Sequence, residues 1–118
     1  WLATFAAFFG EELPDTSAED SFNMLSALQG KKPGRQALVS HSMWGQFAIT
    51  HQGWKLILNE GSGGWGDSPK GNYPPGQLYH LAKDSLEQHN LYHKQPGKVA
   101  ELEALLRRYQ QEGRSRFE

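Results

Sequence analysis

The sequence predicts an α+β fold, in which a small antiparallel sheet of about four strands packs against a C-terminal helix. Three observations support this prediction. Short runs rich in β-formers occupy the middle of the chain, an apolar period of helical spacing follows near its end, and residues 1–9 are apolar nearly throughout. With 118 residues, 37% of them hydrophobic and 21% charged, the chain has the size and composition of one folded domain.

Residues 1–9 predict an N-terminal apolar helix that ends at Gly10, because glycine commonly follows the last helical residue. This segment is about half the length that spans a bilayer, and it lacks the basic start of a signal peptide, so no membrane partner is expected. A chain that opens within an apolar helix suggests a start inside a larger protein. In isolation the segment must be covered, either by folding back on the sheet or by self-association through Trp1–Phe9.

The strands and the last helix are predicted from residue type and spacing. Ser17 and Asp20 form a capping-box pattern ahead of a short helical turn that ends at Gly30. A tight turn that ends in Gly53 joins two of the strands, which must therefore be antiparallel. The predicted strands are 36–41, 44–50, 54–58 and 77–81. Pro96 then begins a helix with apolar residues at helical spacing, namely Val99, Leu102, Leu105, Leu106 and Tyr109.

Residues 60–76 predict a long loop, because they contain six glycines and three prolines. Within it, residues 61–66 match the pattern G-x-G-x-x-G. A dinucleotide site needs a helix directly after that pattern, and residues 67–75 cannot begin one. Two interpretations stay open: a surface loop without a ligand, or backbone amides and Ser62 around an anionic group, with Trp65 as a flat face for a sugar.

Neither a metal site nor a catalytic group is predicted. His89 and His93 are four residues apart, but they lie in a polar connection without a cluster of carboxylates. The chain has no cysteine and no G-x-S-x-G elbow, so no nucleophile is marked. Its formal net charge is −1 and no long basic run occurs, so nucleic acid is not an expected partner.

His41 is the histidine with two equally weighted interpretations. It ends a predicted strand and precedes Ser42, where a strand delivers side chains to a loop. It is either a hydrogen-bonded histidine at the end of a sheet or a residue that faces a ligand. Trp44 and Trp54 are assigned to strands, where cross-strand aromatic packing is commoner than a role in a carbohydrate platform.

Two segments resemble the C-terminal portion of type I (formylglycine-dependent), arylsulfatase-like sulfatases. Residues 47–57, FAITHQGWKLI, are similar to the sulfatase hairpin a-I-R-x-G-x-W-K-L-I. Residues 77–91 are similar to E-L-Y-D-L-x-x-D-P-x-E-x-x-N-L, and the terminal helix follows as in the family. The loop Gly-Ser-Gly-Gly-Trp is similar to that of family members that act on sulfated sugars. The chain departs from the pattern at three positions, Thr50 for arginine, His80 for aspartate and Ser85 for proline.

The resemblance implies a division of the chain and of the chemistry. Residues 1–34 would be the linking helix and connection from a large sulfatase domain, and residues 35–118 the C-terminal subdomain. The family's formylglycine arises in a C/S-x-P-x-R motif, and calcium is held by Asp and Asn residues. That motif is absent, since Ser68 precedes Pro69 directly and no other serine has proline two places on. Calcium and formylglycine are thus expected in the missing large domain, no cofactor is expected in this chain, and the chain alone is predicted to be inactive.

The resemblance also implies a role on the substrate side. The parent would be a sulfuric ester hydrolase, periplasmic or secreted if it is bacterial, with the large domain and a sulfated carbohydrate as partners. Loops at one end of the sheet would form a wall of the substrate pocket. The candidate substrate-binding residues are His41, Ser42, Ser62, Gly63, Gly64 and Trp65. The alternatives are a free-standing carbohydrate-binding module that uses Trp65, His41 and Ser42, or a scaffold without a ligand.

Overall fold

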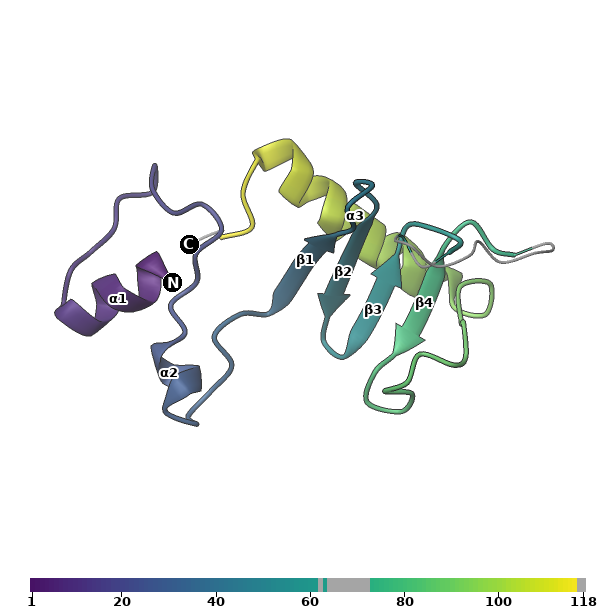
Figure 1. Cartoon of the computed structure of the whole chain (residues 1–118), viewed down its shortest axis with the longest axis horizontal. Helices are drawn as coiled ribbons and strands as arrows, with labels where there is room; N and C mark the ends of the chain where they lie inside the picture. The colour runs from purple at the N-terminus through teal and green to yellow at the C-terminus, as the bar shows by residue number, and fades with distance from the viewer. Residues whose placement is uncertain (62, 64–72, 117–118) are drawn as a thin grey trace. The chain divides into compact units, whose positions relative to one another are not determined.

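The computed structural model describes residues 1–61, 63 and 73–116, and it confirms the α+β class (Figure 1). The four strands form one antiparallel sheet in the order β1-β2-β3-β4. They are β1 (Ala37–His41), β2 (Phe47–His51), β3 (Trp54–Ile57) and β4 (Gln77–His80). The helices are α1 (Leu2–Phe9), α2 (Leu25–Leu28) and α3 (Pro96–Glu112).

The chain divides into two compact units. One unit is Ala37–Arg107, which contains the sheet and most of α3. The other joins Trp1–Gln36 to the chain from Arg108 onward. The boundary at residue 34 between a linking segment and a sulfatase-like subdomain stays a prediction. Among the described residues, no helix combines the length and apolarity needed to cross a membrane.

The turn between β2 and β3 has the geometry that the sequence predicts. Gln52 and Gly53 have φ values of 48° and 77°, so both lie in the left-handed region that a two-residue hairpin requires. The turn sets the register in which Ile49 faces Leu56, and β4 continues that row with Leu78.

The core of the sheet unit lies on one face of the sheet. Ile49, Leu56 and Leu78 have no exposed surface, and they share a face because side chains alternate along each strand. Helix α3 lies along this face (Figure 1), where it buries Val99, Leu102 and Leu106. Burial of each such aliphatic side chain contributes about 1.5–3 kcal/mol. On the opposite face the register places both polar and apolar residues, namely Lys55, Gln77, Tyr79, Leu38, Ala48 and Ile57.

The sequence placed Trp44 and Trp54 in strands, and the structure confirms this for Trp54 only. Trp54 is the first residue of β3 and packs against the His80 ring of β4, with ring centroids 4.5 Å apart. The prediction for Trp44 is wrong. The strand begins only at Phe47, because Ser42 and Gln46 close a turn through a hydrogen bond from the Ser42 N–H to the Gln46 carbonyl, 2.9 Å long. Trp44 lies in that turn and is 62% exposed.

In the other unit, α1 ends at Gly10 as predicted, with Gly10 at φ 76° and ψ 19°. The capping box is wrong, because α2 begins at Leu25 with Met24 as its N-cap. Asp20 instead accepts hydrogen bonds from the backbone N–H and hydroxyl of Ser115, at 2.9 and 2.7 Å. The backbone N–H of Leu25 donates a hydrogen bond to the side-chain oxygen of Asn23 at 2.9 Å.

The segment at the far end of the chain runs along the connection after α1. The backbone N–H of Arg116 donates to the Glu19 carbonyl at 2.9 Å, and its guanidinium donates to the Ser17 carbonyl at 2.7 Å. Arg114 donates to the Asp15 carbonyl. These bonds explain why the residues after α3 group with the N-terminal unit.

Helix α1 is held by its small and polar side. The Thr4 hydroxyl accepts from the Met24 N–H at 3.0 Å, and the Ser21 hydroxyl accepts from the Ala3 N–H at 3.0 Å. The large apolar side chains of α1 and of its N-cap residue remain exposed, each by more than half of its surface: Trp1, Leu2, Phe5, Phe8 and Phe9. Self-association through this surface stays a prediction.

Candidate functional site

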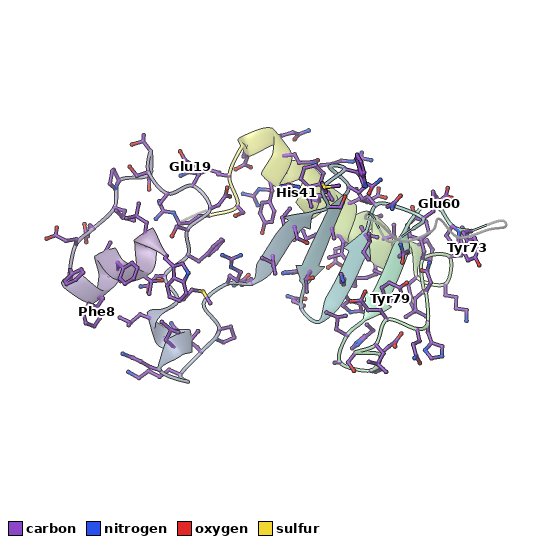
Figure 2. All side chains as sticks on the ribbon, in the orientation of Figure 1. Phe8, Glu19, His41, Glu60, Tyr73 and Tyr79 are labelled. Atoms are coloured by element: carbon purple, nitrogen blue, oxygen red, sulfur yellow. The ribbon has the colours of Figure 1, made fainter. Side chains whose placement is uncertain are left out.

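One end of the sheet gathers the connections that the sequence singled out. By the pairing register, β1 and β3 finish at the end where β2 and β4 begin. Both the 42–46 turn and the long 58–76 connection therefore leave from this end, which we call the site end. Figure 2 shows His41, Glu60 and Tyr73 toward it, with Tyr79 farther along the sheet.

The 42–46 turn is fixed by Ser42. Its hydroxyl accepts from the backbone N–H groups of Trp44 and Gln46, both at 3.2 Å, and donates to the Gln46 side-chain oxygen at 3.0 Å. The N–H of Gly45 donates to the Ser42 carbonyl at 3.0 Å, and Gly45 has a φ of 77°. Because the hydroxyl makes three bonds inside the turn, Ser42 positions its neighbours.

His41 is exposed at the end of β1. Its Nδ1 lies 2.9 Å from the Ser42 carbonyl oxygen. A carbonyl can only accept, so Nδ1 must carry the proton, and in the neutral ring Nε2 is then an acceptor. The ring also lies 5.9 Å from the ring of Phe47, between centroids. His41 is thus both hydrogen-bonded at the sheet end and able to accept a bond from a hydroxyl group.

Gly63 brings the glycine loop to the same turn. It has a φ of 71°, and a Cβ at this position would lie 3.1 Å from the Gln46 side-chain oxygen and 3.2 Å from Ser42 Cβ. Only glycine suits both the backbone angle and the close approach. The other predicted loop residues, Ser62, Gly64 and Trp65, lie outside the described residues.

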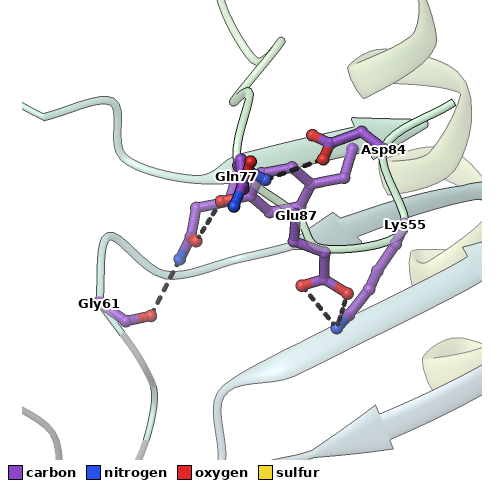
Figure 3. Close-up of polar contacts among 7 residues, drawn as sticks. Lys55, Gly61, Gln77, Asp84 and Glu87 are labelled. Carbon is purple, nitrogen blue, oxygen red and sulfur yellow. Dashed lines mark hydrogen bonds and ion pairs between the residues drawn. The ribbon is translucent and has the colours of Figure 1, made fainter. Parts of the chain in front are cut away.

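Gln77 holds the beginning of the same loop. Its side-chain N–H₂ donates to the carbonyls of Asn59 and Gly61, at 2.8 and 2.9 Å, and Tyr79 donates its hydroxyl proton to the Gln77 side-chain oxygen at 2.8 Å. Figure 3 shows Gln77 and Gly61 in this arrangement. Gly61 is therefore held at the start of β4, while Gly63 lies against the β1–β2 turn.

An open pocket of about 360 Å³ lies on the β4 side of the site end. The residues that line it include Glu60, Tyr73, Gln77, Tyr79, Gln88 and Asn90. None of them was selected from the sequence. A partial signal existed, because Gln77 and Tyr79 flank Leu78 and so had to lie on the face opposite the core. Gln88 and Asn90 come from the connection after β4, and only the fold brings them here.

An ion pair lies on the face of the sheet opposite the core. Lys55 Nζ lies 2.7 and 3.0 Å from the two Glu87 carboxylate oxygens, with both side chains about 30% exposed (Figure 3). Tyr79 faces Lys55 across the strands and is 7% exposed. Burial, and then the carboxylates of Glu87 and Asp84, raise the pKa of Tyr79. Its hydroxyl therefore stays protonated and keeps donating to Gln77.

Asp84 organises the connection after β4. Its carboxylate accepts the backbone N–H groups of Gln88 and His89, at 3.0 and 2.8 Å, and these bonds hold the pKa of Asp84 below its usual value. The His89 ring lies 3.5 Å from the same carboxylate, while His93 packs against the Tyr92 ring. Within residues 1–61, 63 and 73–116, no three histidine, aspartate or glutamate side chains form a group that could hold a metal ion.

No protein-family model matches the chain. Over 109 residues it is 32% identical to an N-acetylgalactosamine-6-O-sulfatase of Bacteroides thetaiotaomicron, which covers 89% of this chain and 21% of the relative. A solved 6S-sulfatase structure, from work on glycosaminoglycan metabolism by Bacteroides thetaiotaomicron, is similar with a TM-score of 0.70 and 30% identity. That match covers 89% of this chain and 23% of the other. The chain thus spans about a fifth of the length of these relatives.

Two further structures share the fold. Ps i-CgsB is similar with a TM-score of 0.63, and its complex with k-i-k-neocarrahexaose with a TM-score of 0.61, each at 20% identity and over 91% of this chain and 22% of the other. At that identity the likeness shows the fold alone. The resemblance to the C-terminal portion of sulfatases is confirmed by the two matches at 30% identity or more. This chain is homologous to the C-terminal part of carbohydrate sulfatases.

Proposed function

We propose that this chain is the substrate-side subdomain of an enzyme that hydrolyses sulfate esters of a carbohydrate, and that its site end forms one wall of the substrate pocket. The observation that carries the proposal is the convergence of exposed His41, the glycine loop and the polar pocket at one end of the sheet. The relatives support a carbohydrate substrate, since one is an N-acetylgalactosamine-6-O-sulfatase and one structure contains k-i-k-neocarrahexaose.

The catalytic centre belongs, in this proposal, to the part of the parent enzyme outside this chain. Hydrolysis of a sulfate ester needs a nucleophile and an electrostatic clamp on the sulfate oxygens. The chain has no cysteine, and none of its serines lies in an S-x-P-x-R motif. Formylglycine and calcium, which the family's chemistry uses, are therefore assigned to the missing large domain.

The groups at the site end suit sugar hydroxyls. His41 Nε2 can accept a hydroxyl proton, and the glycines at 63 and 64 allow a close backbone approach, with Ser62 and Trp65 as further contacts. The pocket beside them has the Glu60 carboxylate in its lining. A carboxylate accepts hydroxyl protons and repels a sulfate, so the pocket is suited to an unsulfated part of the carbohydrate.

The test compares two substrates of the full-length enzyme. His41→Ala and Trp65→Ala should lower kcat/KM for an oligosaccharide that ends in N-acetylgalactosamine 6-sulfate by about two- to ten-fold, the effect of one lost hydrogen bond or contact. Both variants should leave kcat/KM for 4-nitrophenyl sulfate nearly unchanged, because that substrate has little beyond the sulfate for a distant wall to contact. His51→Ala is the matched control, since His51 lies at the opposite end of the sheet.

Two results would contradict the proposal. Equal losses on both substrates would assign the variants a structural role, and no loss on either would remove these residues from the pocket. The proposal also requires a C/S-x-P-x-R motif in the same reading frame upstream of the Trp1 codon, and an unrelated upstream sequence would overturn it.

A further inference from the structure

Glu60 differs from the other carboxylates of the sheet unit in its surroundings. Each of the others in the described part of this unit lies 2.6–3.6 Å from a basic nitrogen: Glu101, Glu87, Asp84 and Glu103. For Glu60, the described residues provide neither an ion pair nor a hydrogen bond to the side chain. Within residues 1–61, 63 and 73–116, the charge of Glu60 is thus not explained by a structural ion pair.

The backbone on both sides of Glu60 is held by one side chain. The Gln77 N–H₂ group donates to the carbonyls of Asn59 and Gly61, the two residues that flank Glu60, at 2.8 and 2.9 Å. The Tyr79 hydroxyl fixes the orientation of that amide at 2.8 Å. A ligand that binds the Glu60 carboxylate therefore has to order its side chain but not its backbone, which lowers the entropic cost of binding.

The pocket beside Glu60 has the size and polarity of a site for a small polar ligand. Its volume of about 360 Å³ lies within the range of small-molecule sites, and Glu60 and Tyr73 both line it (Figure 2). Gln88 adds a side-chain amide, so the lining offers hydrogen-bond donors as well as the carboxylate. None of the described residues in the lining is a lysine, an arginine or a histidine.

This lining distinguishes ligands by their charge. A sugar hydroxyl donates to a carboxylate in a charge-assisted hydrogen bond. A carboxylate or sulfate on the ligand is instead repelled by Glu60, with no described cation in the lining to offset the repulsion. The pocket therefore favours a neutral sugar through the same group that disfavours an anionic one.

We propose that Glu60 is a specificity-determining residue, which selects an uncharged sugar next to the sulfated one and discriminates against a uronate or a second sulfated sugar at that position. This assignment rests on the proposed function, since it presumes that the site end faces the carbohydrate. It goes beyond that function by naming the residue that reads the neighbouring sugar and the charge that this residue rejects. Gln77 is a positioning residue in this assignment, because it holds the backbone of Glu60 and leaves the carboxylate to the ligand.

The test uses the full-length enzyme and two disaccharides that differ only at one carbon. Both contain N-acetylgalactosamine 6-sulfate, joined in the same linkage to glucose in one and to glucuronate in the other. Wild type should have the higher kcat/KM for the glucose disaccharide. Glu60→Gln should lower the ratio of the two kcat/KM values by about ten-fold, because the variant loses a repulsion from one substrate and a charge-assisted bond to the other. Glu103→Gln, which removes the same charge from α3, should leave the ratio unchanged.

Salt separates charge from shape in the same experiment. At about 1 M salt the Debye length is about 3 Å, so the preference of wild type for the glucose disaccharide should weaken, while the ratio for Glu60→Gln should change little. A preference of wild type that does not depend on salt would assign the discrimination to shape and overturn the role of the Glu60 charge.

The remaining outcomes distinguish this assignment from the proposed function. Failure of wild type to hydrolyse either disaccharide would overturn both. Hydrolysis of both with an unchanged ratio in Glu60→Gln would overturn the assignment alone, and that is also the result expected if another part of the enzyme covers the pocket. Equal losses on both substrates, together with a lower melting temperature of Glu60→Gln, would show a structural role for Glu60 and would also overturn the assignment.

Discussion

Tyr79 orients the side chain of Gln77, two residues before it on β4, through a hydrogen bond of 2.8 Å from the phenol to the amide oxygen. With its oxygen occupied, the Gln77 amide must turn its N–H₂ group toward the carbonyls of Asn59 and Gly61, which it bonds at 2.8 and 2.9 Å. A buried phenol thus determines where the glycine loop begins. This relationship between the sheet and the loop leads to the first prediction.

Tyr79→Phe should reduce the amount of stability that the protein loses between neutral and alkaline pH. Burial and nearby carboxylates raise the pKa of Tyr79 above its ordinary value of 10.0. The folded protein therefore keeps the phenol proton at a pH where the unfolded chain releases it. The stability that this provides is fully present below pH 10.0 and is lost as pH rises through the folded-state pKa. Urea midpoints at about pH 8 and about pH 11 measure the slope. Equal slopes for wild type and variant would contradict the prediction.

Asp84→Asn should lower the stability of the protein at neutral pH and make that stability fall less steeply as the solution is acidified. Backbone N–H groups of Gln88 and His89 lower the pKa of this carboxyl below its ordinary value of 3.8. Its contribution is present above that value and disappears as pH falls through the folded-state pKa. Wild type should therefore be more stable than the variant at neutral pH, and the two should converge at low pH. A constant difference in urea midpoint across this range would contradict the role of Asp84.

Gly76→Ala should destabilise the sheet unit by about 1–3 kcal/mol, because a methyl group there overpacks the core edge. The added Cβ would lie 2.5 Å from a Tyr92 ring carbon and 3.0 Å from the Ile57 carbonyl oxygen. Gly97→Ala is the matched control, since a Cβ there meets nothing within 4 Å and alanine favours the helix. Urea denaturation of the two variants should shift in opposite directions, and a neutral Gly76→Ala would show that the Tyr92 ring moves away without cost.

The chain alone should associate through α1. Phe5, Phe8 and Phe9 are 56%, 67% and 72% exposed, so the helix presents an apolar surface to water. Sedimentation should give a dimer or larger oligomer, and Phe8→Glu combined with Phe9→Glu should shift it toward monomer. Leu86→Glu, at a residue that is 75% exposed, should have no such effect. A wild-type monomer at high concentration would disprove the idea.

The chain alone should also fail to hydrolyse 4-nitrophenyl sulfate in the presence of calcium. It has no serine or cysteine in the motif that yields formylglycine. The control is a preparation from cells that carry the empty vector. Turnover above that control, abolished by a substitution within this chain, would show that the chain has a catalytic group of its own.

The strands and the last helix were predictable because their signals are local. Gly53 supplies the positive φ of the β2–β3 turn, and Leu102 and Leu106 mark the buried face of α3. Trp44 was misassigned because the run from Trp44 to Thr50 is rich in β-formers, and nothing in it reveals that Ser42 bonds back to Gln46. Asp20 was misassigned for a similar reason, since its partner, Ser115, is 95 residues away.

The candidate site was predicted in outline only. His41 and Gly63 were selected from the ends of strands and from the glycine loop, and the structure places both at the site end. The pocket on the β4 side was missed, because Gln88 and Asn90 reach it only through the path of the connection after β4. That path depends on the Asp84 carboxylate, whose bonds to backbone N–H groups have no sequence signature of their own.

The bonds of Arg116 to Ser17 and Glu19 set an order of events during synthesis. Ser17 and Arg116 are 99 residues apart in the sequence. Ser17 and Glu19 therefore emerge from the ribosome long before Arg116 does. At about 5–20 residues per second, several seconds pass in which residues 15–20 lack these bonds. The four strands, the last of which ends at His80, are synthesised within that interval, whereas the unit that contains Ser17 and Glu19 can be completed only after Arg116 follows.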